Sequence, residues 1–188
     1  MQHVESRRAA LGWPRAKDGA GAASRVLAVH VRRGDKGGGG RAGRIVVDID
    51  TYIEQMQELV LALGAPPVLG GSRDSRAPSH VFIGGDDTET VYAFRDSAAS
   101  FGLQAMLDEE EARTATDNSA MMLLSHEHNV TRYALDAICN VELLSSADYF
   151  VGTFGSHLSR LAYELRLGRS GGFDGPPLSL DVLWFVNP

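Results

Sequence analysis

The feature that most constrains the fold is the alternation of short apolar runs with segments of helical period. Five runs are nearly uninterrupted in apolar character, as strands covered on both faces of a sheet are. Amphipathic segments lie between most of them, and this alternation is typical of parallel strands joined by crossover helices. The predicted strands are Val26–Val31, Val81–Gly84, Leu103–Leu107, Tyr149–Thr153 and Val182–Val186.

Four helices are predicted between these strands, each from a cap residue and an apolar stripe. The first has Asp50 as its N-cap and ends at Gly64, and the second runs from about Asp87 to Ser100. The third starts near Thr131 and the fourth close to Ser156. The periodicity predicts that the following positions face inward: Ile53, Met56, Val60 and Leu63; Val91, Phe94 and Ala98; Ala134, Ala137, Ile138, Val141 and Leu144; and Leu158, Leu161, Ala162 and Leu165.

The predicted fold class is therefore α/β, a Rossmann-like parallel sheet with helices on both faces. The 188 residues, 44% of them hydrophobic, are enough for one domain with a substantial core, which we place at residues 24–188. Residues 1–23 are predicted to be a poorly ordered N-terminal tail. Two segments rich in Gly, Pro and Ser, residues 65–78 and 168–177, are predicted to be loops.

Charge and composition exclude several classes of function. The net charge of −6 argues against a broad nucleic-acid surface, so an anion site would be a local concentration of arginine. The single cysteine, Cys139, excludes an internal disulfide and is interpreted as a core residue. No stretch approaches the roughly 20 apolar residues of a membrane span, and residues 1–19 lack the apolar core of a signal peptide.

A charged cluster, His30-Val31-Arg32-Arg33-Gly34-Asp35-Lys36, follows the first predicted strand. Ligands of open α/β sheets bind beyond the carboxyl ends of the strands. Because side chains alternate along a strand, His30 and Arg32 are predicted to point to one side and Val31 and Arg33 to the other. Arginine suits a bidentate grip on phosphate. A solvated turn is an equally good interpretation of this cluster taken alone.

Two further clusters follow predicted strands. Asp86 and Asp87 open a helix, where capping is about twice as good an explanation as catalysis, and no metal is predicted there. Thr153-Phe154-Gly155-Ser156-His157 is a strand-to-helix turn, whose backbone N–H groups and Ser156 hydroxyl suit a phosphate. An ordinary Ser156 N-cap explains this turn about equally well.

Two short motifs carry weaker signals. His126-Glu127-His128 has no third ligand at a spacing usual for zinc, so a surface turn is several times better as an explanation. Asn129-Val130-Thr131 is an N-glycosylation acceptor only if the chain enters the secretory pathway.

Taken in order, VHVRRGDK, FIGGDD, LLSSADYFVGTFGSHLSRLAYEL and the late SLD resemble the α1,6-fucosyltransferase type of glycosyltransferase. That family's pattern runs HxRRxDK, a strand ending in DD, an S-x-ADF-x-V-x-TFSSQ-x-x-R-x-AYE block, and SLD. The resemblance extends from about Val26 to Phe185. It implies that the chain corresponds to the C-terminal, donor-binding half of a GT-B fold. It also implies GDP-fucose as donor, inverting fucose transfer to a glycan or glycoprotein acceptor without a metal or other cofactor, and a Golgi location.

The same resemblance assigns roles to individual residues. Arg32 would hold the β-phosphate, His30 would lie near guanine, and Ser156 with the neighbouring backbone would bind phosphate oxygens. The residues that it implies as catalytic are Arg32, Asp35 and Lys36, and those that it implies as donor-binding are His30, Arg32, Arg33, Asp86, Asp87, Asn140, Ser156 and His157.

Three positions depart from the family pattern. Gly40 stands where the family has the Glu that is its candidate general base, and a glycine cannot accept a proton. Asp48 or Asp50 could substitute, although the spacing does not show it. Asn140 replaces an acid that faces guanine in the family, and Asp136 could partly compensate. His157 stands where the family has Gln.

A GT-B enzyme places its active site between two halves, and the resemblance covers only one. An N-terminal acceptor domain, encoded upstream, is therefore expected as a partner. The rival hypothesis is a non-catalytic nucleotide-sugar-binding module, which the Gly40 and Asn140 departures favour. The HVRRGDK and TFGSH segments favour retained binding. A third possibility is a fold of this class with an inert site.

Overall fold

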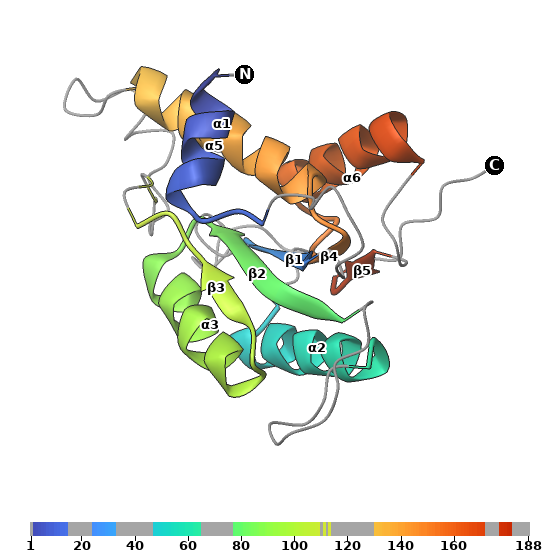
Figure 1. Cartoon of the computed structure of the whole chain (residues 1–188). Helices are drawn as coiled ribbons and strands as arrows, with labels where there is room; N and C mark the ends of the chain where they lie inside the picture. Colours follow the sequence, from blue (N-terminus) through green and yellow to red (C-terminus); the bar gives the residue numbers. More distant parts are fainter. Residues whose placement is uncertain are drawn as a thin grey trace.

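The computed structural model describes residues 2–14, 24–32, 47–64, 77–109, 111, 113, 130–171 and 177–181. These residues form a five-stranded parallel sheet of order β3-β2-β1-β4-β5, with helices on both faces (Figure 1). The strands are β1 (Arg25–Val31), β2 (Pro78–Gly85), β3 (Gln104–Met106), β4 (Tyr149–Gly152) and β5 (Leu178–Ser179). The helices are α1 (Gln2–Ala10), α2 (Ile49–Ala62), α3 (Thr88–Ser100), α5 (Val130–Ser145) and α6 (His157–Ser170).

The predicted fold class is confirmed, and the first four predicted strands lie within two or three residues of β1 to β4. The predicted strand at residues 182–186 lies outside the described residues. In the described part of the chain the fifth strand is β5, which pairs with β4 through Val151 and Gly152. A two-residue strand next to the Gly- and Pro-rich segment is too short for an apolar pattern to indicate it.

Alternation along β1 divides the core into two layers. Leu27, Val29 and Val31 pack against side chains of α2 and α3, including Met56 and Phe94. Val26 and Ala28 face the opposite layer, which α5 and α6 cover. The side chains buried there include Leu143 and Leu144 of α5, Ala162 of α6, Phe82 of β2, Phe150 of β4 and Phe154 of the turn after β4. Because both faces are covered, the strands read as continuous apolar runs.

The helix starts agree with capping chemistry, with one correction. Asp48, not the predicted Asp50, is the N-cap of α2, and its carboxylate accepts from the Ile49 N–H at 2.8 Å. Asp50 lies in the first helical turn, where a carboxylate also favours the helix dipole, so the sequence offered two equivalent signals. Asp87 caps α3, and Ser156 occupies the N-cap position of α6 as predicted.

The predicted inward stripe of α5 was wrong in part. Ala134 and Ile138 are exposed, Ile138 by 58%, whereas Asp136, Cys139 and Asn140 are buried. The helix is rotated relative to the prediction because Asp136 and Asn140 form polar contacts next to the sheet. These contacts stabilise the helix more than burial of the Ile138 side chain would. In α6, Leu161 is likewise exposed and Ala162 is fully buried. Cys139 is a buried core thiol as predicted, and burial raises its pKa.

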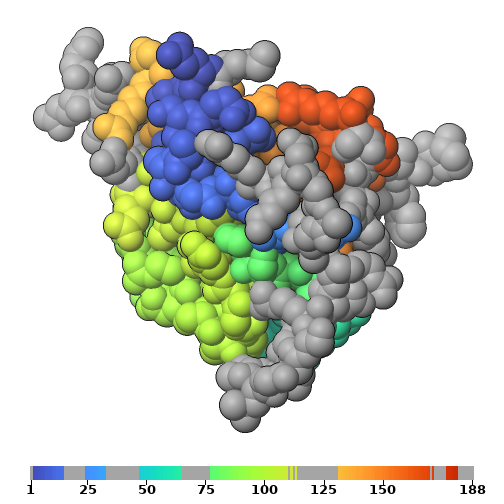
Figure 2. Space-filling view, in the orientation of Figure 1, coloured from blue at the N-terminus to red at the C-terminus, as the bar shows by residue number. Residues whose placement is uncertain are grey.

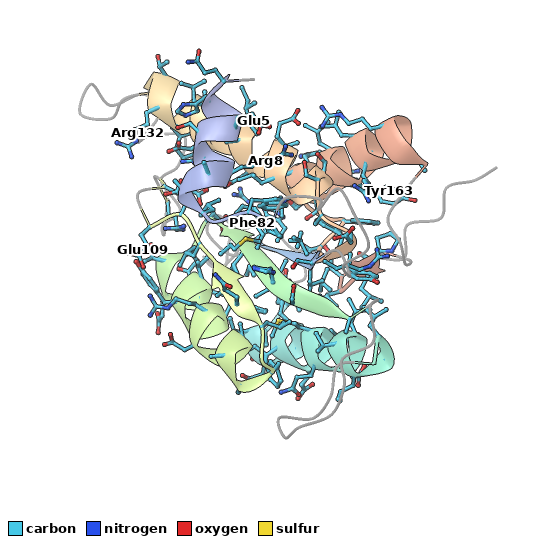
Figure 3. All side chains as sticks on the ribbon, in the orientation of Figure 1. Glu5, Arg8, Phe82, Glu109, Arg132 and Tyr163 are labelled. Carbon is cyan, nitrogen blue, oxygen red and sulfur yellow. The ribbon has the colours of Figure 1, made fainter. Side chains whose placement is uncertain are left out.

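The prediction of a poorly ordered tail was wrong for residues 2–14. Helix α1 packs on α5, and Figure 2 shows it as a compact ridge on the molecular surface. Trp13, just after α1, packs its ring on Phe82 with centroids 5.6 Å apart, and the Arg8 guanidinium lies 5.9 Å over the same ring. Figure 3 labels Arg8 and Phe82. These contacts are made through a helix with no buried apolar stripe, which is why periodicity did not indicate it.

None of the helices in the described ranges is both long and apolar enough to span a membrane.

Candidate functional site: the carboxyl ends of β1, β2 and β4

The strand order places a topological switch point between β1 and β4, since the chain continues from β1 to β2 on one side and reaches β4 on the other. The carboxyl ends of these strands, and the starts of α3 and α6, therefore meet at one edge of the sheet (Figure 1). Open α/β sheets bind ligands at such a place. The described residues of the first three polar clusters, residues 30–32, 86–87 and 153–157, converge there.

His30, near the end of β1, points toward the layer of α5 and α6. Its Nδ1 and the Oγ of Ser159 in α6 are joined by a 2.7 Å hydrogen bond, and both side chains are buried. Val31 packs in the opposite layer, so the predicted alternation is confirmed for these two residues. Gly152 makes the contact possible, because a Cβ there would lie 2.9 Å from the Phe150 ring and 3.0 Å from Ser159 Oγ.

Arg32 follows β1 and is held by Asp86, which follows β2. Arg32 Nη1 donates to Asp86 Oδ2 at 2.6 Å, and the two side chains are 22% and 10% exposed. Asp87 next to it caps α3 by accepting from the Thr90 N–H at 2.9 Å. The two aspartates therefore divide their roles: Asp87 is the helix cap that the sequence favoured, while Asp86 orients a guanidinium that remains partly accessible.

The turn from β4 to α6 is less open than the sequence predicts. The Gly155 N–H donates to Asp181 Oδ2 at 2.9 Å, the Phe154 N–H to Ser179 Oγ at 3.2 Å, and the Ser156 N–H to the Thr153 carbonyl. These N–H groups are engaged within the chain. The first-turn N–H groups of α6, from residue 157 to 159, have no intrahelical partner by helix geometry, and they remain as anion donors.

Ser156 is 5% exposed, and its hydroxyl makes no capping hydrogen bond in the described part of the chain. His157 is exposed at the first position of α6. The missing cap bond leaves the Ser156 hydroxyl available to another partner, which agrees better with the phosphate interpretation than with an ordinary N-cap.

A small pocket of about 40 Å³ lies between the strand ends and α5. It has room for a few water molecules and not for a nucleotide, so a larger ligand requires its side chains to move apart. It brings together four predicted site residues, His30, Arg32, Asp86 and Asn140. Asp87, Ser156 and His157 do not line it. The other described lining residues are Gly85, Glu111, Tyr133, Asp136, Ala137 and Leu158.

Glu111 is a pocket residue that sequence reasoning missed. Its Oε2 pairs with Arg113 Nη2 at 3.0 Å, its Oε1 accepts from Asn140 Nδ2, and its side chain is 7% exposed. Burial raises the pKa of Glu111 to about 7, against the opposing effects of Arg113 and Asn140. The only signal in the sequence is the acidic run at residues 108–111, which is ordinarily a solvated surface feature.

Asp136 is buried in the same wall and is neutralised from α1. Arg7 Nη2 donates to Asp136 Oδ1 at 2.7 Å, while Arg7 Nε lies 2.5 Å from Asp108 Oδ2. Arg132, one turn away on α5, lies 3.9 Å from Asp136. The helix that the sequence did not predict therefore holds one wall of the pocket.

Tyr52 of α2 and Thr153, which follows β4, bury their hydroxyls close to the carboxyl end of β1. Burial raises the pKa of Tyr52 to about 12, with Thr153 and the Arg32 backbone acting in the opposite direction. Neither hydroxyl has a partner of good hydrogen-bond geometry in the described ranges. Tyr52 is therefore a neutral, structural side chain at working pH.

Several predicted residues lie outside the described residues: Arg33, Asp35, Lys36, Gly40 and the His126-Glu127-His128 motif. Asp48 and Asp50 are exposed on α2 and do not line the pocket. Within the described part of the chain, no three His, Cys, Asp or Glu side chains are grouped as a metal site would need.

A larger groove of about 760 Å³ lies between α1, α5 and the segment after β3. Glu109 and Arg132, labelled in Figure 3, are among its lining residues. None of the predicted catalytic or donor-binding residues lines it, and Asp136 is the described residue that lines both this groove and the small pocket.

Comparison with protein families gives a match over most of the chain. A model of the family described as alpha-(1,6)-fucosyltransferase N- and catalytic domains matches residues 15–183. The alpha-(1,6)-fucosyltransferase of Drosophila melanogaster is 29% identical over 156 residues, which are 82% of this chain and 20% of that relative. The chain thus spans about a fifth of the length of this curated relative.

Comparison with solved structures supports the same fold. A crystal structure of POFUT1 in complex with GDP is similar with a TM-score of 0.54 and 15% identity, covering 97% of this chain and 46% of that one. A crystal structure of apo POFUT1 is similar with a TM-score of 0.52 and 14% identity, with the same coverage. At this identity the similarity shows the fold, and the chain corresponds to less than half of each structure.

Proposed function

We propose that this chain, which belongs to the alpha-(1,6)-fucosyltransferase family, binds GDP-fucose at the carboxyl ends of β1 and β4 for fucose transfer to a glycan or protein acceptor. The observation that carries the proposal is the Arg32 guanidinium, oriented by Asp86 at 2.6 Å beside the buried His30. A fixed cation at the switch point of a parallel sheet, next to a helix start, suits a diphosphate.

The proposed reaction places growing negative charge on a phosphate, and Arg32 and the start of α6 can stabilise that charge. The bond between fucose C1 and the β-phosphate oxygen breaks, and its electron pair stays on the leaving GDP. The acceptor oxygen bonds to C1 from the opposite face, which inverts the configuration, and its proton passes to a base. Arg32 and the first-turn N–H groups of α6 would stabilise the charge that grows on the β-phosphate, without a metal.

Similar proteins support the donor assignment. The curated relative is an alpha-(1,6)-fucosyltransferase, and POFUT1, whose fold is similar, has been crystallised with GDP. The acceptor-binding half, the acceptor and a Golgi location are part of the proposal by family resemblance. Sequencing of the gene upstream of Met1 tests the first of these, and the absence of any coding segment there would contradict an acceptor domain encoded upstream.

Calorimetric titration with GDP tests the donor site. Arg32→Ala is expected to weaken GDP binding at least about tenfold, which corresponds to the roughly 1.5 kcal/mol of a charge-assisted hydrogen bond. Arg25→Ala is the matched control, because Arg25 stands at the opposite end of β1, is 28% exposed and pairs with Asp148 at 3.6 Å. Wild-type chain that gives no heat at millimolar GDP would contradict the proposal.

The second candidate function is a nucleotide-sugar-binding module without transferase activity. Gly40, at the position of the family's candidate base, favours it, and neither Asp48 nor Asp50 lines the pocket. Incubation of the chain with GDP-fucose and a panel of glycan acceptors separates the two candidates. Fucosylated product excludes the module, whereas GDP binding without product from any acceptor supports it.

A further inference from the structure

The two walls of the small pocket differ in chemical character. The strand ends contribute the guanidinium of Arg32 and the imidazole of His30. The opposite wall, formed by α5 and Glu111, contributes mainly acceptor oxygens, from Glu111, Asn140 and Asp136. A ligand that suits both walls carries an anion on one side and N–H donors on the other.

Asn140 presents a buried acceptor with no partner. The side chain is only 8% exposed, its Nδ2 donates to Glu111 Oε1, and its Oδ1 has no hydrogen-bond partner in the described part of the chain. Leaving a buried polar atom without a partner is energetically unfavourable. The Oδ1 is therefore a place where a ligand donor gains a full hydrogen bond.

Glu111 beside it is held in place and still has acceptor capacity. Arg113 binds its Oε2 at 3.0 Å, with side-chain exposures of 4% for Arg113 and 7% for Glu111. A carboxylate offers about four lone-pair sites, and the hydrogen bonds from Arg113 and Asn140 use two of them. Glu111 and Asn140 thus form a fixed edge of acceptors next to the nucleotide site.

We propose that the carboxylate of Glu111, hydrogen-bonded to Asn140, is the group of this chain that selects guanine as the base of the bound nucleotide. The proposal rests on the proposed function, because it needs a nucleoside diphosphate at Arg32. Guanine presents two adjacent donors, N1–H and the 2-amino group, to such an edge. Adenine presents its N1 acceptor and a C–H there, so acceptor would face acceptor. Glu111, from a segment outside the recognised motifs, thereby supplies the negative charge that Asn140 lacks.

The electrostatic setting of Glu111 agrees with this role. The charged groups that act on it are Arg113, Arg7 and Asp108, with Asn140 as hydrogen-bond donor, and burial raises its pKa to about 7. Donors from a base favour the ionised carboxylate and lower the pKa. Binding of GDP near pH 7 is therefore accompanied by proton release from Glu111, which calorimetry in buffers of different ionisation enthalpy detects.

The test is calorimetry with GDP, IDP and ADP on the wild-type chain and on Glu111→Ala. IDP lacks only the 2-amino group. The wild-type chain is expected to bind GDP at least about tenfold more tightly than IDP, and ADP more weakly than either. In Glu111→Ala the GDP-to-IDP ratio falls to within about twofold. Glu109→Ala, a change at a 66%-exposed neighbour, keeps the wild-type ratio.

Two outcomes would overturn the inference, and they are distinguishable. If none of the three nucleotides binds the wild-type chain, the proposed function fails and the base selection fails with it. If GDP binds but Glu111→Ala keeps the wild-type ratio, only the base selection fails. Arg32→Ala should weaken GDP and IDP by a common factor. Should Glu111→Ala not fold, Glu111→Gln, which retains one acceptor, is expected to give an intermediate ratio.

Discussion

At the level of single residues, Ser159, which stands at a position that the family pattern leaves variable, positions the side chain of His30. Its hydroxyl lies 2.7 Å from His30 Nδ1, and this bond fixes the orientation of the buried ring. The alternation of the first strand predicted the direction of His30. No sequence pattern predicted its partner, because the two residues are 129 positions apart and a serine in a helix is ordinarily a solvated or capping residue.

Ser159→Ala is expected to leave His30 Nδ1 without this bond in a buried site. The free energy of unfolding should fall by about 1–2 kcal/mol, and the NMR shifts of the His30 ring nitrogens should change. Ser97→Ala is the control, since the Ser97 hydroxyl donates to the Ala93 carbonyl of its own helix, α3. Unchanged ring-nitrogen shifts together with unchanged stability would show that Ser159 does not position His30.

The raised pKa of Glu111 predicts that the stability of the folded chain depends on pH. Its pKa in the folded chain is about 7, above its ordinary value of 4.5, so between pH 5 and 7 the folded state holds more protons than the unfolded state. Ionisation of Glu111 therefore lowers the free energy of unfolding as pH rises through this window. Glu111→Gln should remove this loss, and its stability relative to wild type should improve by at least about 1 kcal/mol from pH 5 to 7.

Urea denaturation at pH 5, 6, 7 and 8 measures this effect. Glu109→Gln, at a 66%-exposed position, should follow the wild-type profile. Parallel profiles for wild type and Glu111→Gln would mean that Glu111 titrates in the folded chain as it does in the unfolded chain.

At the level of helices and strands, α5 shows what hydrophobic periodicity can predict and what it cannot. Helix existence and position were predicted from the sequence, within one residue at the start. The inward face was not, because Asp136 and Asn140 are buried where the pattern favoured Ala134 and Ile138. The rotation depends on partners from α1 and from Glu111, and such long-range polar pairing leaves no periodic signal. The deviation from the apolar pattern lies at the candidate site.

Helix α1 is predicted to support that site through Arg7. Arg7→Ala should destabilise the chain by about 3 kcal/mol, because it removes the main cation beside Asp136, whose side chain is 4% exposed. Arg169→Ala, which removes an ion pair with Glu142 at a 50%-exposed arginine, should cost less than about 1 kcal/mol. Denaturant unfolding compares them, and equal costs would contradict a structural role for the Arg7 network.

At the scale of the whole molecule, the class of the sheet could be predicted from the chain, because doubly covered strands are continuous apolar runs. The convergence of His30, Arg32 and Asp86 followed from the rule that parallel strands bring their carboxyl ends together. Arg7, Glu111 and Ser159 could not be predicted as parts of the site, since each reaches it from a distant part of the chain through polar contacts that leave no local pattern. Three-dimensional packing, and not local pattern, selects them.

A guanine nucleotide is proposed to bind where β1 and β4 end, and a crystal structure of the full chain grown with GDP is the decisive experiment. We expect the β-phosphate within hydrogen-bond distance of Arg32 and the start of α6, with guanine against Glu111 and Asn140 and the small pocket opened. GDP bound instead in the groove between α1 and α5, with Arg32 still closed on Asp86, would rule out this binding site.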